Sequence, residues 1–347
     1  MRSELAAERS EANVRRPPVI AIDAMGGDRA PGAIVDGAFR AIEEVGVDIL
    51  LVGDEATVRD ALGGRTSTHL DVLHASEVIA MDAEPAAAVR AMRDSSIVRA
   101  AEAVRDGRAD AFVGAGNTGA TMAASLLRFG RIAGVARPAI AVPIPIPNPV
   151  AGAARKQLLV DGGATVDPDP AWLVQWARLA QAYATVRLGV AAPTVGLLSN
   201  GEEPGKGDAL RKAAYALLAD GVKDFVGNVE GRDLVGAAAD VIVTDGFTGN
   251  VALKTLEGAM LAMAGLVFGV VDEPAFASVA DALRLRLLEA AADLLPDNTG
   301  GALLLGVKGV CIISHGSSSA DAIVNAVRVA RTCVEADVVA RLTEAAS

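Results

Sequence analysis

Two glycine-rich segments share a pattern that is typical of anion-binding loops. Residues 109–120 read ADAFVGAGNTGA and residues 239–250 read ADVIVTDGFTGN. Each gives Ala-Asp, three apolar residues and a turn that ends in Gly-X-Thr-Gly before a helical pattern. A helix N-terminus has backbone N–H groups without intrahelical partners, and these bind anions. Two ordinary turns with chance identities are an alternative, but the pattern favours two loops that face one cleft and hold a small phosphate.

The first of these segments also fits a dinucleotide site. GAGNTG has the Gly-X-Gly-X-X-Gly spacing, but that site needs an acidic residue about 20 positions further on. No Asp or Glu occurs between Asp110 and Asp161, whereas Arg128, Arg131 and Arg137 leave a 2′-phosphorylated cofactor open. We therefore favour a phosphate cradle and expect no cofactor. The residues that we predict to line it are Gly116, Thr118, Gly119, Gly246, Thr248 and Gly249.

Two further turns carry polar residues that can surround a ligand. Residues 23–28 (DAMGGD) follow the first strand, where open α/β sheets bind ligands, and glycines there permit close backbone approach. Residues 315–321 (HGSSSAD) follow an apolar strand near the C-terminus and offer hydroxyl groups. The aspartates either hold the loop or orient the ligand. The predicted ligand-loop residues are Asp23, Gly26, Gly27, Asp28, Asp245, Ser317 and Ser318.

Two side chains near these turns can transfer protons. Lys254 lies one helical turn after Asn250, on the same face, in a chain with only six lysines. His315, with a reference pKa of about 6.5 for its residue type, can donate a proton to a leaving group at neutral pH. A solvated lysine and a helix-capping histidine are the alternatives. The histidines and cysteines do not come at ligand spacing, so we predict no metal, and no GxSxG motif of a serine hydrolase occurs.

Composition excludes several classes of protein. The net charge of −11 and the absence of a long basic run argue against nucleic-acid binding. Aromatic residues make up 3%, so Ala, Val, Leu and Ile must fill the core, as in parallel α/β proteins. Cys311 and Cys333 are interpreted as structural thiols of a reducing compartment. Residues 1–17 lack the apolar region of a secretory signal and are predicted to be a flexible tail.

The remaining pattern alternates short apolar runs with helix-length segments. This rhythm predicts an α/β fold with a mostly parallel sheet between two helical layers, formed by residues 18–347 as two closely joined lobes. The Pro-dense stretch from Pro138 to Pro149 is not expected to form a regular central strand. Residues 251–295 predict a protruding helical pair for dimer or membrane contact, and the apolar run Ala259 to Val271 is too short to span a bilayer. The expected strands are residues 19–25, 48–52, 71–74, 110–113, 139–144, 157–160, 195–198, 224–226, 240–243 and 310–313, with helices over 86–105, 171–187 and 208–218.

Several blocks in this order resemble one family. DAMGGD, Ser95 and Ser96 after Arg93, GNTGA, GEEPGKG, DGFTGNVALKTLEG, GGALLLG and HGSS are similar to the PlsX family of phosphate acyltransferases, from about Val19 to the C-terminal helix. The resemblance implies an isopropylmalate dehydrogenase-like fold, a homodimer, and transfer of a fatty acyl group from acyl carrier protein to inorganic phosphate for phospholipid synthesis. Thr165 and Ile313 depart from the family pattern.

This chemistry implies roles for particular residues. Phosphate needs positioning more than deprotonation, and Ser95 or Ser96 would help to hold it. The tetrahedral oxyanion needs donors worth about 3 kcal/mol each, which Asn117, Asn250 or Lys308 would supply, while His315 or Lys254 would assist the leaving thiolate. The implied setting is the cytoplasm or the inner membrane surface, beside a downstream membrane acyltransferase. The competing hypotheses are an NAD(P)-dependent decarboxylating dehydrogenase and a non-catalytic lipid- or carrier-binding protein.

Overall fold

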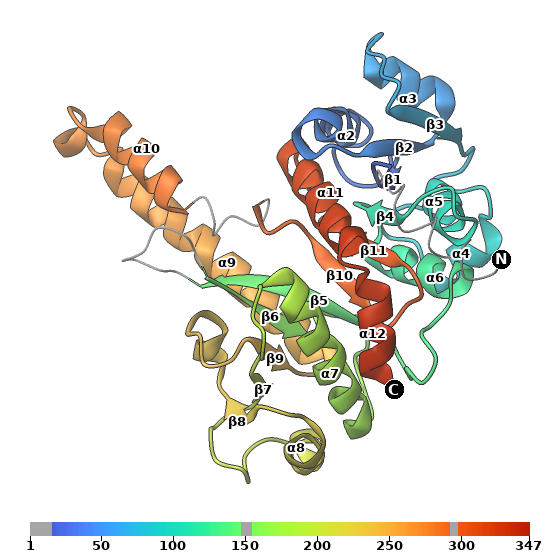
Figure 1. The fold of residues 1–347 in the computed structure, drawn as a ribbon. Coiled ribbons are helices and arrows are strands. Elements are labelled where there is room, and N and C mark those ends of the chain that lie inside the picture. Colours follow the sequence, from blue (N-terminus) through green and yellow to red (C-terminus); the bar gives the residue numbers. More distant parts are fainter. Residues whose placement is uncertain (1–15, 147–154, 292–297) are drawn as a thin grey trace, which may run out of the picture.

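The structure is a computed structural model that describes residues 16–146, 155–291 and 298–347. It contains an 11-stranded sheet in the order β3-β2-β1-β4-β11-β10-β5-β6-β9-β7-β8 (Figure 1). Most of the predicted flexible tail lies outside the described residues. The strands are β1 Val19–Asp23, β2 Asp48–Gly53, β3 Leu70–His74, β4 Ala111–Gly114, β5 Ala139–Ile146, β6 Arg155–Val160, β7 Val195–Leu198, β8 Phe225–Val229, β9 Val241–Val243, β10 Ala302–Leu305 and β11 Val310–Ile313.

Helices cover both faces of this sheet, as predicted. Alternate strand residues point to opposite faces, so Ile20 and Ile22 of β1 join one core cluster and Ala21 joins the other. The first cluster packs under α2, α7, α8, α11 and α12, and the second under α4, α5 and α6. The helices are α2 Gly32–Val45, α3 Glu55–Leu62, α4 Pro85–Ala91, α5 Ser96–Arg105, α6 Thr118–Arg128, α7 Pro170–Arg187, α8 Ala209–Gly221, α9 Gly246–Val271, α10 Ala280–Ala291, α11 Ala320–Glu335 and α12 Val338–Ala346.

The sheet reverses direction near its middle. β1, β4 and β11 run parallel, and β10 pairs antiparallel with both β11 and β5. β5 then pairs antiparallel with β6, which is parallel to β9. Three reversals therefore separate β4 from β9, so these two strands run in opposite directions. The turns that follow them leave the sheet at opposite edges.

The described part of the Pro-dense stretch is a strand, but it is not a regular central strand throughout, as predicted. β5 contains Pro143 and Pro145 and lies between β10 and β6. β10 pairs with residues 139–141 of β5, and β6 pairs with residues 142–146. Alternate residues of a strand direct their backbone groups to the same side, so both prolines lack an N–H on one side only. The strand tolerates them because β10 no longer pairs with it there. Residues 147–154, which include Pro147 and Pro149, lie outside the described residues.

The predicted helix over residues 86–105 is two helices, α4 and α5. Ser95 has extended backbone angles and is the N-cap of α5. Its Oγ donates to the Met92 carbonyl oxygen (2.8 Å) and its side chain is buried. The break matters for the site because it directs Ser96, the first residue of α5, toward the end of β1.

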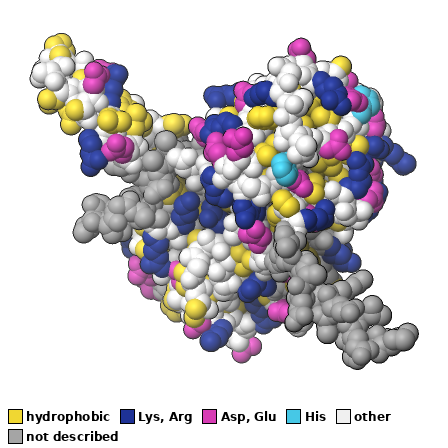
Figure 2. Space-filling model, turned by 45° about the horizontal axis from the view of Figure 1, so that its top comes forward, with side chains coloured by type: hydrophobic (Ala, Val, Ile, Leu, Met, Phe, Trp, Pro, Cys, Tyr) yellow, Lys and Arg dark blue, Asp and Glu magenta, His cyan; other side chains and the backbone are white. Residues whose placement is uncertain are grey.

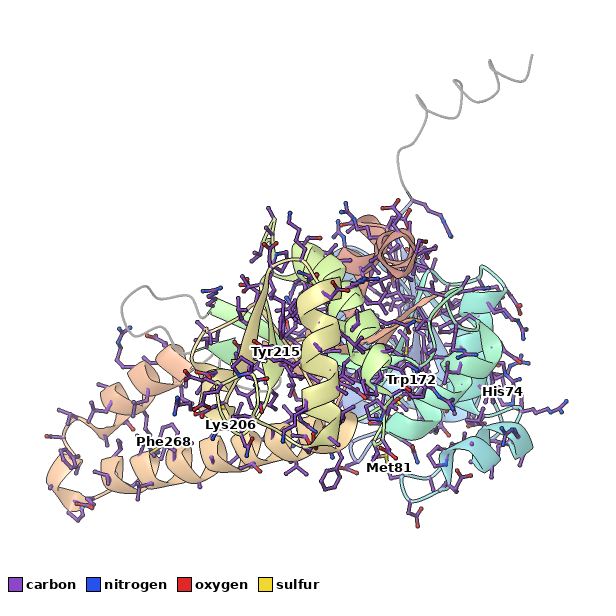
Figure 3. The ribbon with its side chains drawn as sticks, turned by 90° about the horizontal axis from the view of Figure 1, so that it is seen from below. His74, Met81, Trp172, Lys206, Tyr215 and Phe268 are labelled. Atoms are coloured by element: carbon purple, nitrogen blue, oxygen red, sulfur yellow. The ribbon has the colours of Figure 1, made fainter. Side chains whose placement is uncertain are left out.

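α9 and α10 form a hairpin that extends away from the rest of the molecule (Figure 1). Figure 2 shows hydrophobic side chains gathered along it, and Figure 3 shows the same arm in profile, with Phe268 on it. Leu261 and Leu266 are 71% and 65% exposed. The protrusion of this predicted pair is confirmed, and the part from residue 292 to 297 lies outside the described residues.

The apolar run Ala259 to Val271, which was predicted to be too short to span a bilayer, is part of a longer helix. α9 is 26 residues long, and by length and composition it is the one described helix that could cross a membrane, with a mean hydropathy of 1.6 in its most apolar window. Counting the uninterrupted apolar run missed this because Thr255, Glu257 and Gly258 precede the run without ending the helix.

One buried ring gives a test of the packing between α7 and the sheet. Trp176 is fully buried, and its Nε1 donates to the Arg137 carbonyl oxygen (3.0 Å). We expect Trp176→Ala to lower the free energy of unfolding by about 3–5 kcal/mol, because it opens a large cavity. Urea unfolding followed by circular dichroism measures this. Trp172→Ala removes a half-buried ring of the same helix and should lower the free energy of unfolding clearly less. Equal losses in the two variants would contradict the burial of Trp176 in the core.

Candidate functional site

Three turns meet at one edge of the sheet, after β1, β4 and β11. We call residues 23–28, 114–119 and 314–318 the first loop cluster. Gly26 and Gly116 are in backbone contact, and a Cβ added to Gly26 would lie 2.8 Å from Gly116 Cα. Gly27 has a φ of 99°, and the N–H of Asp28 donates to the Gly316 carbonyl oxygen (2.7 Å). The parallel strands thus bring together three of the sequence-predicted turns.

A buried carboxyl group lies beneath this cluster. Asp23 is fully buried, and burial raises its pKa, which the nearby Ser96 hydroxyl and the N–H of Met25 lower in part. Its Oδ1 accepts from the Met25 N–H (3.1 Å). Asp23 Oδ2 and Ser96 Oγ are both buried without a full hydrogen bond to any described residue. Asp23 therefore holds its own loop, and the buried Ser96 hydroxyl lies beside this carboxyl group.

Backbone N–H groups at the start of α6 lack hydrogen-bond partners. Those of Gly116, Thr118 and Gly119 make no hydrogen bond within the described part of the chain. Gly116 is buried against Gly26, whereas Thr118 is exposed and Gly119 is partly exposed, so the last two are the ones that a ligand can reach. These groups sit at the positive end of a helix dipole, beside a neutral capping residue, and so they can bind an anion.

Asn117 is that cap, and its side chain is fully used. Its Oδ1 accepts from the Ala120 N–H (2.9 Å). Its Nδ2 is within 3.1–3.2 Å of three carbonyl oxygens, those of Ala80, Met81 and Ala83. The predicted role of Asn117 as an oxyanion donor is therefore replaced by a positioning role, because both ends of its amide are engaged.

The serines after β11 mainly shape their own turn. Ser318 Oγ donates to the His315 carbonyl oxygen (2.6 Å) and lies 2.8 Å from Ser314 Oγ. Ser319 is the N-cap of α11. Ser317 is exposed, as is Asp28 on the facing turn. Of the two predicted ligand-loop serines, Ser317 is the one placed to reach a ligand.

The second predicted anion loop belongs to a different group of turns. We call residues 161–165 and 245–250 the second loop cluster. Asp161 is buried and accepts N–H groups of four residues, those of Ile140, Gly163, Ala164 and Thr165. Burial raises its pKa and these bonds lower it in part. Gly249 packs so closely on it that an added Cβ would lie 2.0 Å from the Asp161 carbonyl oxygen.

The N–H groups of this second cluster are already bonded. Gly246 donates to the Thr165 carbonyl oxygen (2.8 Å), Thr248 donates to Asp245 Oδ1 (2.8 Å), and Gly249 donates to the Asp245 carbonyl oxygen (2.9 Å). These three N–H groups are therefore not available to phosphate in this conformation, and the predicted contacts through the three residues stay a prediction. Opposite strand directions also place this turn and GAGNTG after strands that end at opposite edges of the sheet.

A buried ion pair explains why Asp245 caps α9. Burial alone would raise the pKa of Asp245, but the Thr248 hydrogen bonds and the Arg211 guanidinium outweigh it and lower the pKa. Arg211 is 7% exposed and bonds to Asp245 and to Thr248 Oγ1 (2.9 Å). Asp245 thus holds the start of α9 rather than a ligand.

α9 carries two predicted side chains from the second cluster to the first. Its N-terminal part packs through Leu253 and Leu256 on β6 and β9. Further along, Lys254 Nζ lies 2.7 Å from Glu257 Oε2, and Glu257 Oε1 lies 3.8 Å from His315 Nε2. The lysine, the carboxylate and the imidazole therefore form one chain of polar groups beside the first loop cluster.

Two predicted donors are placed differently. Lys308 precedes β11, at the opposite end of that strand from His315, about 20 Å away along the strand. Its N–H bonds to the Gly130 carbonyl oxygen at the far end of α6, so the prediction of Lys308 as an oxyanion donor was wrong. Asn250 is exposed on α9, with its side chain against Gly163, and stays a candidate.

Sequence reasoning missed Glu257 and Arg211. Glu257 lies in the quoted block DGFTGNVALKTLEG, three residues after Lys254, on the same face of the helix. That spacing could have identified it. Arg211 lies 34 residues before Asp245, and nothing in the local pattern pairs them.

Known proteins resemble this chain over most of its length. A family model described as "Fatty acid synthesis protein" matches residues 19–341. The chain belongs to this family, the PlsX family. It is an acyltransferase. It is 47% identical over 323 residues to a phosphate acyltransferase of Desulfitobacterium hafniense, covering 91% of this chain and 93% of the relative. It is 46% identical over 329 residues to one of Myxococcus xanthus, covering 93% and 92%.

Solved structures show the fold that PlsX proteins share with other enzymes. A phosphotransacetylase from Streptococcus pyogenes matches with a TM-score of 0.59 at 16% identity, covering 97% of this chain and 99% of the other. A branched-chain phosphotransacylase from Enterococcus faecalis matches with a TM-score of 0.55 at 16% identity, covering 91% and 99%. The predicted α/β/α class is confirmed by this likeness.

The contact between the first two turns of the cluster gives a test. A methyl group at position 26 would lie 2.4 Å from Asp23 Oδ2, so we expect Gly26→Ala to displace the GAGNTG turn and lower acyltransferase activity at least tenfold. Gly32→Ala is the matched control, because a Cβ there meets no atom within 4 Å. Full activity of Gly26→Ala in a steady-state assay would refute the close packing as a requirement of the site.

Proposed function

We propose that this enzyme transfers a fatty acyl group from acyl carrier protein to inorganic phosphate, at the first loop cluster. The observation that carries the proposal is the convergence of open N–H groups at α6 with the Lys254, Glu257 and His315 chain. The first can hold phosphate and the second can supply a proton. The names of the relatives support phosphate as the acceptor, and the acyl phosphate formed would then serve glycerol 3-phosphate acylation in phospholipid synthesis.

Phosphate would bind at the N-terminus of α6. The N–H groups of Thr118 and Gly119 provide donors at the accessible start of this helix, above the buried Asp23 and Ser96. The exposed carboxylate of Asp28 stands near this position and would repel phosphate unless phosphate approaches from the α6 side. Positioning is the main requirement, because phosphate is already a nucleophile near neutral pH.

The reaction then needs one proton for the leaving group. A phosphate oxygen attacks the thioester carbon, a tetrahedral oxyanion forms, and the carbon–sulfur bond breaks as acyl phosphate is released. The carrier thiolate takes the proton. His315, which is 42% exposed, and Lys254 are the donors available at this place, and Glu257 holds both in position.

The apolar part of the donor has a surface beside the cluster. Met81 is 49% exposed, its methyl group lies 2.9 Å from where a Cβ of Gly316 would be, and its carbonyl oxygen accepts from Asn117. Figure 3 shows Met81 at the surface of the molecule. We assign it to contact with the acyl chain near the thioester.

Four arginines that could attract an acidic carrier protein are all held by other groups. Arg284 pairs with Asp272, Arg286 with Glu289, and Arg128 with Glu102. Arg131 donates to the Ala136 carbonyl oxygen. Carboxylates thus partly offset the charges of the first three. A homodimer, a peripheral position at the membrane and a downstream membrane acyltransferase remain part of the proposal.

The assay follows loss of acyl carrier thioester and appearance of acyl phosphate, with and without phosphate. We expect His315→Ala to lower kcat about 100-fold, the scale of a lost general acid. Lys254→Ala should lower it less, because His315 remains. Phosphate-independent thioester loss at the same rate would overturn phosphate as the acceptor.

Glu257 is proposed as a positioning residue, and the separate effects on kcat and KM test it. Glu257→Gln removes the carboxylate that lies between Lys254 Nζ and His315 Nε2, so it should lower kcat about tenfold and leave the KM for phosphate unchanged. Glu257→Asp should restore part of kcat. Glu44→Gln removes a carboxylate paired with Arg40 on a different surface and serves as control. An unchanged kcat in Glu257→Gln would exclude the role.

A further inference from the structure

A second basic site lies outside the loop clusters, between α7 and α11. A cavity of about 210 Å³ is lined there by Lys156, Arg187, Asn298, Thr299, Gly300, Asn325, Arg328, Val329 and Thr332. Three of these nine residues are cationic and none is acidic, in a chain whose net charge is −11. Such a volume suits a small ligand, since pockets for drug-sized molecules usually span about 300–1,000 Å³.

The two arginines of this cavity are held by neutral acceptors. Arg187 Nη2 donates to the Thr299 carbonyl oxygen (2.6 Å), and Arg328 Nη1 donates to Asn325 Oδ1. No ion pair joins Arg187 or Arg328 to a carboxylate within the described ranges. A positive charge without a carboxylate partner favours an anion at the same place.

A second cavity shows that this arrangement is not general in the molecule. The larger one contains Arg16 and Arg331 together with Asp110, Glu335 and Asp337. There Arg16 pairs with Asp110 (3.2 Å) and Arg331 with Glu335 (2.8 Å). Its two arginines are matched by carboxylates, whereas Arg187 and Arg328 have no such partner among the described residues, so the cavity between α7 and α11 is the better candidate for an anionic ligand.

The walls of the basic cavity come from two rigid elements and one short segment. Arg328 and Asn325 lie on one face of α11, three residues apart, and Arg187 is the last residue of α7. Gly300 packs against α11, where an added Cβ would lie 2.6 Å from Val329. The donors are guanidinium, ammonium, amide and hydroxyl groups, which is the set that recognises a phosphate group.

We propose that this cavity binds a phosphate group at a site distinct from the phosphate of acyl transfer. Its place in the fold connects the two sites. α11 begins at the turn that carries His315, and a Cβ on Gly301 would lie 2.8 Å from the Ile313 carbonyl oxygen, one residue before Ser314. A ligand that draws α7, α11 and residues 298–301 together therefore fixes the elements on both sides of that turn. The source is either inorganic phosphate or a phosphate ester.

Isothermal titration calorimetry with inorganic phosphate and, separately, glycerol phosphate tests the site. Arg328 is exposed, so Arg328→Gln should fold normally, which its thermal unfolding checks. Loss of one charged hydrogen bond predicts about tenfold or more weaker binding of one class of phosphate. Arg341→Gln, an equal charge change at an exposed residue of α12, should bind like the unaltered protein. A stronger response to glycerol phosphate would assign the site to an ester, and a stronger response to phosphate would assign it to the free ion.

The calorimetry separates this site from the proposed function. Arg328→Gln should keep its kcat at saturating phosphate, because it touches no residue of the first loop cluster. Absence of acyl transfer in the unaltered protein and in all variants would refute the proposed function, and the calorimetry would still show whether the second site binds phosphate. Equal affinity and stoichiometry for both ligands in the unaltered protein, Arg328→Gln and the double variant Lys156→Gln/Arg328→Gln would overturn the second site.

Discussion

The pairing of β10 with β5 is the constraint on which the rest of the structure depends. It joins two groups of parallel strands that run in opposite directions, through antiparallel contacts such as Leu303 with Ala141. Ligand turns form at the C-terminal ends of parallel strands, so each group directs its turns to its own edge. The molecule therefore needs an element that crosses between the edges, and α9 does so.

The two similar glycine-rich turns show how one local pattern takes two roles. Both begin a helix, but the cap of α6 is the neutral Asn117 and the cap of α9 is the charged Asp245. A carboxylate at the cap satisfies the helix start by itself and repels a second anion, whereas the amide of Asn117 satisfies one N–H and leaves others open. The turn before α9 therefore bonds to other parts of the protein, whereas the turn before α6 keeps N–H groups that a ligand can use.

The sequence was sufficient for the fold class and for ten of the eleven strands, because these follow from local periodicity. It did not predict β10, the strand through which the sheet reverses, and it could not show strand direction, since β5 and β10 carry no mark of the reversal. The repeat shared by GAGNTG and DGFTGN likewise did not indicate that their strands run in opposite directions. Nor could it show that Lys308 and His315 lie at opposite ends of β11. Arg211 escaped notice because its partner is distant along the chain.

The exposed hairpin and the first loop cluster share one helix. α9 is one continuous helix of 26 residues, about 39 Å long, and it is fixed to the sheet near Leu253 and Leu256. Glu257 lies just past that fixed point, 3.8 Å from His315. The helix that brings this carboxylate to the loop cluster therefore continues outward as the exposed apolar arm, so the arm and the cluster have a fixed relative position.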